Sequence, residues 1–196
     1  MCVMSYVVDD VWGVTVLDDI MYVVCTWSSA ILLYNKNTYR PLDIVIKVNG
    51  MSFPSDIVLS DRQLYIADNN CIWRVSVDDH SYVKWLSTKS TTHRFHNTRL
   101  SVTSHRLLVT SWDPPGLRQY STSDAQLLRV VELPRYVNEL LHSVETTRGT
   151  FVIGHKGTSQ NEWQEAVSEL FRFCHVFCSL VLMTVCYFDS MKLILK

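Results

Sequence analysis

The sequence predicts an all-β fold, a β-propeller with about four four-stranded blades that form an incomplete ring. Three observations support this prediction. Short apolar segments recur along the 196 residues with a period of 43. Each repeat holds four segments rich in Val, Ile, Tyr and Trp, which favour strands. No segment before residue 160 offers the long helices that an α/β fold places between its strands. Four-stranded units at this period are typical of β-propellers.

The second strand of each repeat sets the period. Four windows are apolar at the same phase, and each lies 43 residues after the one before it without a gap: 21–25, 64–68, 107–111 and 150–154. These windows carry apolar residues on both faces, which fits a sheet packed between two neighbours.

A shorter strand precedes each window by eight residues, at 13–16, 56–59, 99–102 and 142–145. The residues between the two strands are turn formers, such as Asp18-Asp19 and Arg148-Gly149. We therefore expect each repeat to open with a β-hairpin.

Two further strands complete the first three repeats. The third strand is expected at 31–34, 72–75 and 117–120, and the fourth at 42–46, 82–86 and 127–131. The fourth strand alternates more between apolar and polar residues, as an outer edge does. The predicted domain is a partial propeller over 1–170, with blades of about 1–48, 49–91, 92–134 and 135–170, followed by a hydrophobic tail over 171–196.

The second repeat resembles a known family. Phe53-Pro54-Ser55-Asp56-Ile57-Val58, followed by the segment from Leu64 to Val75, is similar to an NHL repeat, and the match is best over 49–88. The resemblance implies a propeller of the six-bladed group. A WD40 repeat has a similar period, but Trp112-Asp113 and Gly154-His155 stand at the wrong phase for its two signature dipeptides.

Composition narrows the function classes. The chain has 18 basic and 19 acidic side chains, a net charge of −1 and 47% hydrophobic residues, which argues against a disordered chain and a generally basic nucleic-acid binder. The start, MCVMSYVVDD, has no basic segment before an apolar run, so no signal peptide is predicted and the expected location is cytoplasmic. Six cysteines without paired spacing argue against a disulfide framework.

The expected function is a non-catalytic binding or scaffold module that binds another protein through one face. In a four-stranded meander the loops after the second and fourth strands share a face, and in propellers this face rings the central channel. The candidate contact residues lie in or beside these loops: Trp27, Asn69, Asn70, Lys89, Arg94, Phe95, Arg99, Trp112, Asp113, His155 and Lys156.

Other functions remain open. Residues 89–135 hold seven basic and three acidic groups, and a basic stretch with an interleaved aromatic predicts contacts to RNA, which some NHL propellers bind.

The resemblance also extends to calcium-dependent lactonases, although this chain has no glutamate before Glu132 to serve as a metal ligand. His93-x-x-His96 and Cys174-His175-x-x-Cys178 lack the two further ligands of a structural zinc site, so no metal, cofactor or small-molecule substrate is expected.

The tail breaks the repeat. From Phe171 onward the sequence has no glycine and no Pro-x-Asp-Ile-Val segment of the kind that starts the second repeat. Three interpretations stay open: a transcript artefact that ends a longer propeller, a strand or helix packed on the last blade, and a membrane segment over 171–188 that would anchor the protein. The uncharged stretch from Val176 to Phe188 is shorter than the about 20 apolar residues of a spanning helix.

Overall fold

The computed structural model describes residues 10–69, 71–87, 98–112, 115–133, 138–147, 149–156 and 192–195. All regular structure in these residues is β-strand, in four antiparallel sheets. The four-stranded blades predicted from the 43-residue period are confirmed for the first three repeats.

The first three sheets each hold four strands in sequence order. Blade 1 consists of β1 (Val11–Leu17), β2 (Ile20–Cys25), β3 (Ala30–Asn35) and β4 (Pro41–Lys47). Blade 2 consists of β5 (Asp56–Ser60), β6 (Gln63–Asp68), β7 (Cys71–Ser76) and β8 (Tyr82–Ser87). Blade 3 consists of β9 (Arg99–Thr103), β10 (Arg106–Ser111), β11 (Gly116–Ser121) and β12 (Leu127–Val131). Blade 4 consists of β13 (Asn138–Glu145), β14 (Phe151–Lys156) and β15 (Lys192–Leu195).

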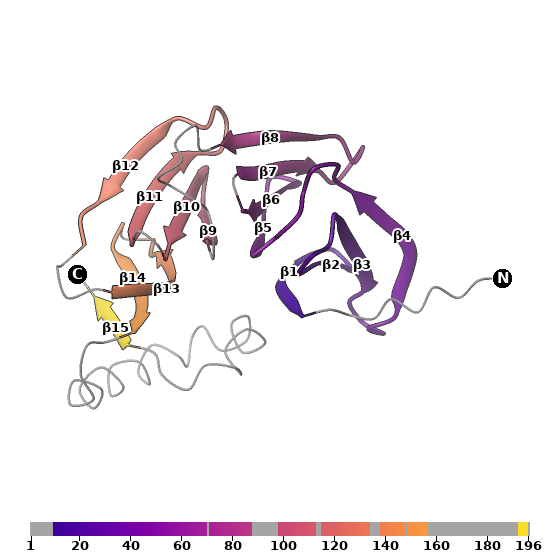
Figure 1. The fold of residues 1–196 in the computed structure, drawn as a ribbon, viewed down its shortest axis with the longest axis horizontal. Coiled ribbons are helices and arrows are strands. Elements are labelled where there is room, and N and C mark those ends of the chain that lie inside the picture. The colour runs from indigo at the N-terminus through magenta and orange to yellow at the C-terminus, as the bar shows by residue number, and fades with distance from the viewer. Residues whose placement is uncertain are drawn as a thin grey trace.

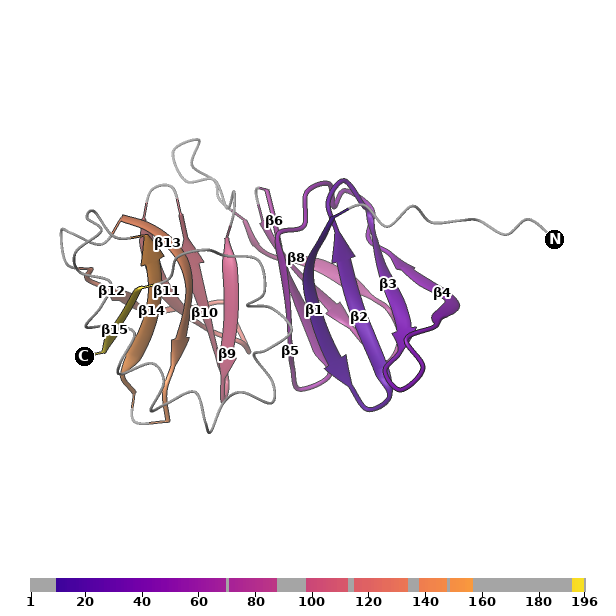
Figure 2. The same cartoon turned by 90° about the horizontal axis from the view of Figure 1, so that it is seen from below.

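The blades stand side by side in an arc. Figure 1 shows the first strand of each blade innermost and the fourth strands β4, β8 and β12 on the outer rim. Neighbouring blades meet through their inner strands, β1 with β5, β5 with β9 and β9 with β13, and Figure 2 shows β5 between β1 and β9. In the described part of the chain the ring is open between blade 4 and blade 1.

The hydrophobic core lies between the blades. The largest cluster joins blades 1 and 2 and includes Val24, Ile31, Leu64, Ile66 and Trp73. A second cluster joins blades 2 and 3, and a smaller one joins blades 3 and 4. A sheet between two neighbours buries both faces, and the second strands β2, β6 and β10 are buried along most of their length.

The hairpins that open the first three blades have two-residue turns, and each turn contains left-handed backbone. Asp18 has a φ of 54°, Asp61 and Arg62 have φ of 47° and 58°, and Ser104 has a φ of 52°. Two-residue hairpin loops need positive φ because the primed turns match the twist of the strands. Aspartate tolerates this conformation better than most residues.

The corresponding hairpin of blade 4 is longer, and this corrects the gap-free period. Here the turn runs from Thr146 to Thr150, with Gly149 at a φ of 75°. Ser143 pairs with Ile153, whereas Leu100 in blade 3 pairs with Val109. Ile153 is therefore the equivalent of Val109, 44 residues later, because the longer turn shifts β14 by one residue.

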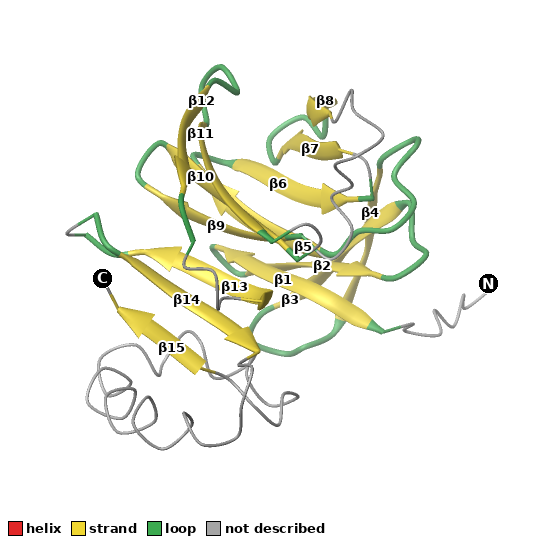
Figure 3. Ribbon diagram, turned by 60° about the vertical axis from the view of Figure 1, so that its left-hand side comes forward, coloured by secondary structure: helices red, strands yellow, loops and turns green. Residues whose placement is uncertain are grey.

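The end of the chain adds a strand to blade 4. Lys192–Leu195 forms β15, which pairs antiparallel with β14, and Figure 3 shows the two strands side by side. These are the only residues of the 171–196 tail that the structure describes. The segment 171–188, named as a membrane candidate, lies outside the described residues, and no helix long and apolar enough to cross a membrane occurs among those that are described.

Candidate binding face

The two faces of the propeller differ in how their connections are built. One face, the turn face, carries the turns after the first and third strands of each blade. In blade 1 these turns are bonded to each other, since Lys36 Nζ donates to Asp18 O at 2.5 Å and Asn37 Nδ2 to Asp19 Oδ1 at 3.2 Å. In blade 2, Arg62 bridges to Asp78 with a nitrogen–oxygen distance of 2.6 Å. The opposite face, the loop face, carries the loops after the second and fourth strands.

Among the described residues, Trp27 is the most exposed large apolar side chain on the loop face, at 72%. It lies in the loop from β2 to β3, in a turn closed by Ser28 N donating to Cys25 O at 3.3 Å. Its φ of 62° is uncommon for a bulky residue. Its ring contacts that of Phe53, from the loop between β4 and β5, with centroids 3.9 Å apart. Two loops of the face thus present one aromatic pair.

A buried carboxylate shapes the loop that carries Phe53. Asp68, at the end of β6, accepts hydrogen bonds from the backbone N–H groups of Ser52 at 3.2 Å, Phe53 at 2.7 Å and Asn69 at 2.9 Å. It also accepts one from Trp73 Nε1 at 3.0 Å. These hydrogen bonds hold the backbone of the loop between β4 and β5 against the end of β6.

Arg99 lies at the start of β9 and connects three blades. Its Nη1 donates to the backbone oxygen of Trp12 at 3.2 Å and also to that of Ser55. The guanidinium lies over the Trp12 ring, 5.1 Å from its centroid. Arg99 was predicted as a contact for a partner or for RNA, but in the structure it is half-buried and bonded to the backbone of blades 1 and 2.

Arg99 belongs to a set of equivalent positions that sequence reasoning missed. Gly13, Asp56, Arg99 and His142 are spaced by 43 residues and stand on the four inner strands. The 43-residue period was the signal that could have found them. Gly13 is required for close packing, since a Cβ atom there would lie 2.8 Å from Ile57 N.

Burial shifts two titratable groups of this set in opposite senses. Burial raises the pKa of Asp56 to about 6, although Arg99 and the N–H groups of Leu100 and Ile57 act against the shift. Burial, together with repulsion from Arg99, lowers the pKa of His142 to about 4. Both pKa shifts arise because burial disfavours the charged form of each group.

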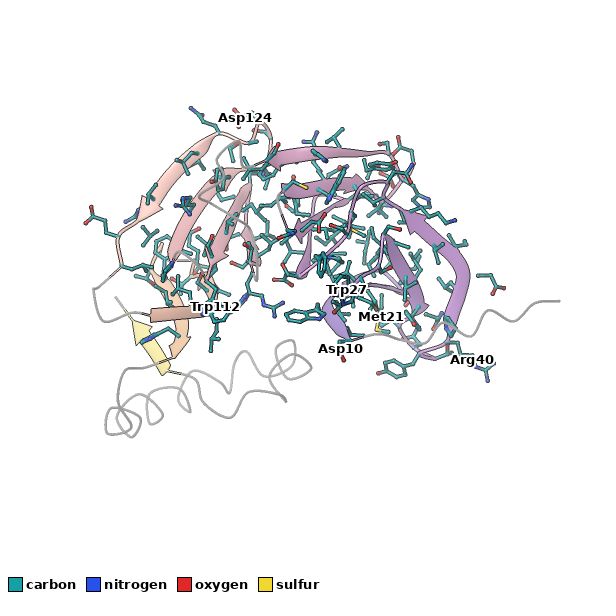
Figure 4. All side chains as sticks on the ribbon, viewed as in Figure 1. Asp10, Met21, Trp27, Arg40, Trp112 and Asp124 are labelled. Atoms are coloured by element: carbon teal, nitrogen blue, oxygen red, sulfur yellow. The ribbon has the colours of Figure 1, made fainter. Side chains whose placement is uncertain are left out.

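The remaining candidate residues differ in exposure, and several of them lie outside the described residues. Trp112 follows β10 and is 36% exposed, and Figure 4 shows it and Trp27 on opposite arms of the arc. Asn69 is half-buried, with its backbone bonded to Asp68. His155 is 2% exposed because β14 continues to Lys156, two residues beyond the predicted strand end, which places His155 in the blade rather than in a loop. Asn70, Lys89, Arg94, Phe95, Asp113 and the Lys156 side chain lie outside the described residues.

Among the described residues, no three His, Cys, Asp or Glu side chains gather as a metal site would require. The loop face thus presents the aromatic pair of Trp27 and Phe53, and the Asp68 carboxylate holds the backbone of the loop that carries Phe53.

Solved structures share this fold. No protein-family model matches the chain, and no curated protein matches it. The computationally designed protein Ika4 superposes with a TM-score of 0.59 at 12% identity, over 76% of this chain and 88% of Ika4. The WD40 β-propeller domain of Doa1 superposes with a TM-score of 0.57 at 12% identity, over 78% of this chain and 52% of that one. The fold is that of a β-propeller.

A nidogen/laminin complex contains a further similar chain, with a TM-score of 0.63 at 14% identity. The alignment covers 77% of this chain and 59% of that chain. The present chain therefore spans only about half of the Doa1 and nidogen/laminin chains, whereas it spans most of Ika4. At these identities the similarity shows the fold alone.

Proposed function

We propose that this chain is a non-catalytic binding module of the β-propeller type, which binds another protein through its loop face. The observation that carries the proposal is Trp27, an indole that is 72% exposed and packed against Phe53. We propose in addition that the module is of the NHL-like kind, since the residues behind that resemblance build this face. Pro54 is buried beside Phe53, and Asp68 anchors the loop.

Trp27 has the properties of a binding hot spot. Tryptophan is enriched among residues that carry binding energy, because it buries a large area and loses few rotamers. An exposed indole already held by a neighbouring ring loses still less conformational freedom on binding.

The comparisons add support from the architecture. One of the similar chains comes from a structure described as a nidogen/laminin complex, and that protein thus binds a protein on a related scaffold. These findings make protein binding the function that the loop face supports best.

A peptide library displayed on phage tests the proposal. Peptides are selected on the full chain, and the affinity of the enriched sequences is then measured by titration calorimetry. We expect Trp27→Ser and Phe53→Ser each to weaken binding about tenfold or more, as loss of a hot spot does.

Tyr39→Ser is the matched control, because Tyr39 is 62% exposed, has a φ of 55° and lies in a turn of the opposite face of the same blade. Its affinity should equal that of the unchanged chain. Selected peptides that bind equally well to the Trp27→Ser variant would show that the loop-face aromatic pair is not the binding site.

A further inference from the structure

The inner strand of blade 1 exposes one residue, Val14, whose equivalents are buried in every other blade. Val14 is 49% exposed, whereas the residues 43, 86 and 129 positions later, Ile57, Leu100 and Ser143, are 2%, 1% and 1% exposed. Val16, on the same face of β1, is 42% exposed. This patch, formed by Val14 and Val16, is named the leading face.

The other blades show what covers such a face. Ile57 is buried in the cluster that blade 2 forms with Val24 and Ile31 of blade 1. Leu100 is buried against Tyr65 and Ala67 of blade 2. Ser143 is hydrogen-bonded to Thr110 of blade 3. In each case the occupant is the preceding blade, so the leading face of blade 1 has the chemistry of a blade-to-blade contact.

The opposite end of the arc presents the complementary surface, named the trailing face. Val144, on the inner strand of blade 4, is 37% exposed. Its equivalent in blade 2 is Val58, 86 residues earlier, which packs into the cluster shared with blade 3. Val144 pairs with Val152 just as Val58 pairs with Tyr65, so β13 and β14 retain the arrangement that covers a following blade.

The outer part of the leading side is already covered. Val23, Cys25 and Leu32, on the second and third strands of blade 1, form a buried cluster of their own. The exposed apolar surface on this side is therefore concentrated on the inner strand, where neighbouring blades of a propeller make contact. A small, well-defined strip of this kind fits a single partner sheet.

We propose that two copies of this chain associate head to tail, with the leading face of one copy packed on the trailing face of the other. A second copy supplies a propeller blade with the trailing face that the leading face requires. Contacts between different patches of this type close into rings when the rotation permits and otherwise extend into filaments.

Sedimentation velocity on the full chain, from low to high micromolar concentration, tests the proposal. We expect the apparent mass to rise to at least twice that of a single chain. The double variant Val14→Lys/Val16→Lys should return it to the mass of one chain. Val83→Lys is the matched control, since Val83 is also 49% exposed but lies on outer strand β8, and it should assemble like the unchanged protein.

A mixing experiment tests the polarity. Val144→Lys should by itself also give single chains. When it is mixed with Val14→Lys/Val16→Lys, each copy retains one intact face, and a pair should form again. A chain that stays single at every concentration, association that survives the double variant, or association that Val144→Lys leaves intact would each overturn the proposal.

Discussion

The junction between blades 1 and 2 and the junction between blades 3 and 4 differ in the kind of contact that holds them together. The first is a large apolar cluster, whose buried members include Val24, Leu64 and Trp73. The second has a smaller apolar cluster and adds polar contacts: Gln119 Nε2 donates to Glu145 Oε2 at 2.7 Å, and Arg106 pairs with Glu145 Oε1 at 3.3 Å.

Neighbouring blades of the same repeat type can thus be joined in two ways, by apolar packing alone or by apolar packing with hydrogen bonds and an ion pair. Apolar packing is non-directional, so it scales with the area buried and tolerates small shifts. A buried carboxylate such as Glu145 needs its partners in place, because an unpaired polar group in the interior is costly. The blade 3–4 junction should therefore be more specific in its geometry and the blade 1–2 junction the larger source of stability.

The largest effect is expected in the apolar junction. Ile66→Ala removes a fully buried side chain from the cluster and should lower the free energy of unfolding by about 2–5 kcal/mol, through lost burial and the cavity left behind. Urea denaturation followed by fluorescence measures this. Val83→Ala, on the exposed outer strand, should stay within about 0.5 kcal/mol of the unchanged chain. Equal losses in the two variants would contradict an apolar origin of stability at this junction.

A smaller effect is expected in the polar junction. Glu145→Ala leaves the Gln119 amide without its acceptor and should cost about 1–3 kcal/mol in the same urea experiment. Glu132→Ala serves as its control, since Glu132 is exposed beyond β12 and should change stability by about 0.5 kcal/mol or less. If Glu145→Ala proves as mild as Glu132→Ala, the polar contacts do not hold blades 3 and 4 together.

The last effects concern the pH dependence of stability, and they compare Asp56, at the junction of blades 2 and 3, with His142, in blade 4 at the open end of the arc. The pKa of Asp56 is raised to about 6, so its contribution to stability is full below its unfolded value near 4 and is lost as pH rises through 6. The pKa of His142 is lowered to about 4, so its contribution is present above 6.5 and is lost as pH falls toward 4. Between pH 6 and pH 4 the two act in opposite directions.

Single substitutions should separate these two groups. Relative to the unchanged chain, Asp56→Asn should lose stability as pH falls from 7 to 4, because only His142 then titrates in this set. His142→Asn should gain stability over the same range, because only Asp56 remains. Thermal unfolding at each pH measures both slopes, and slopes of the same sign in the two variants would contradict the assignment.

The strands and their order could be predicted from the sequence because they follow from local patterns. Period-two alternation, turn formers and the 43-residue repeat all act over a few residues, and β1 to β12 lie where these patterns place them. The one-residue shift of β14 escaped prediction, since Thr146 to Thr150 looks like any polar turn and its length matters only when the strands pair. The pairing of β15 with β14 joins segments far apart in the chain.

The candidate face was harder to predict than the fold. Trp27 was identified from its place in a loop, and it is exposed there. The roles of Asp68 and Arg99 depend on partners from other loops and other blades, which no local pattern encodes. His155 was assigned to a loop because the strand was ended two residues early, and its burial follows from the true length of β14.

The anchoring of the loop by Asp68 has a consequence for how this surface can change. The carboxylate binds Ser52 and Phe53 only through their backbone N–H groups, so the shape of the loop does not depend on which side chains stand at these two positions. Substitutions there alter what the loop displays and leave the path of its backbone unchanged. The side chains at positions 52 and 53 can therefore differ while the carboxylate keeps holding the two backbone N–H groups of the loop.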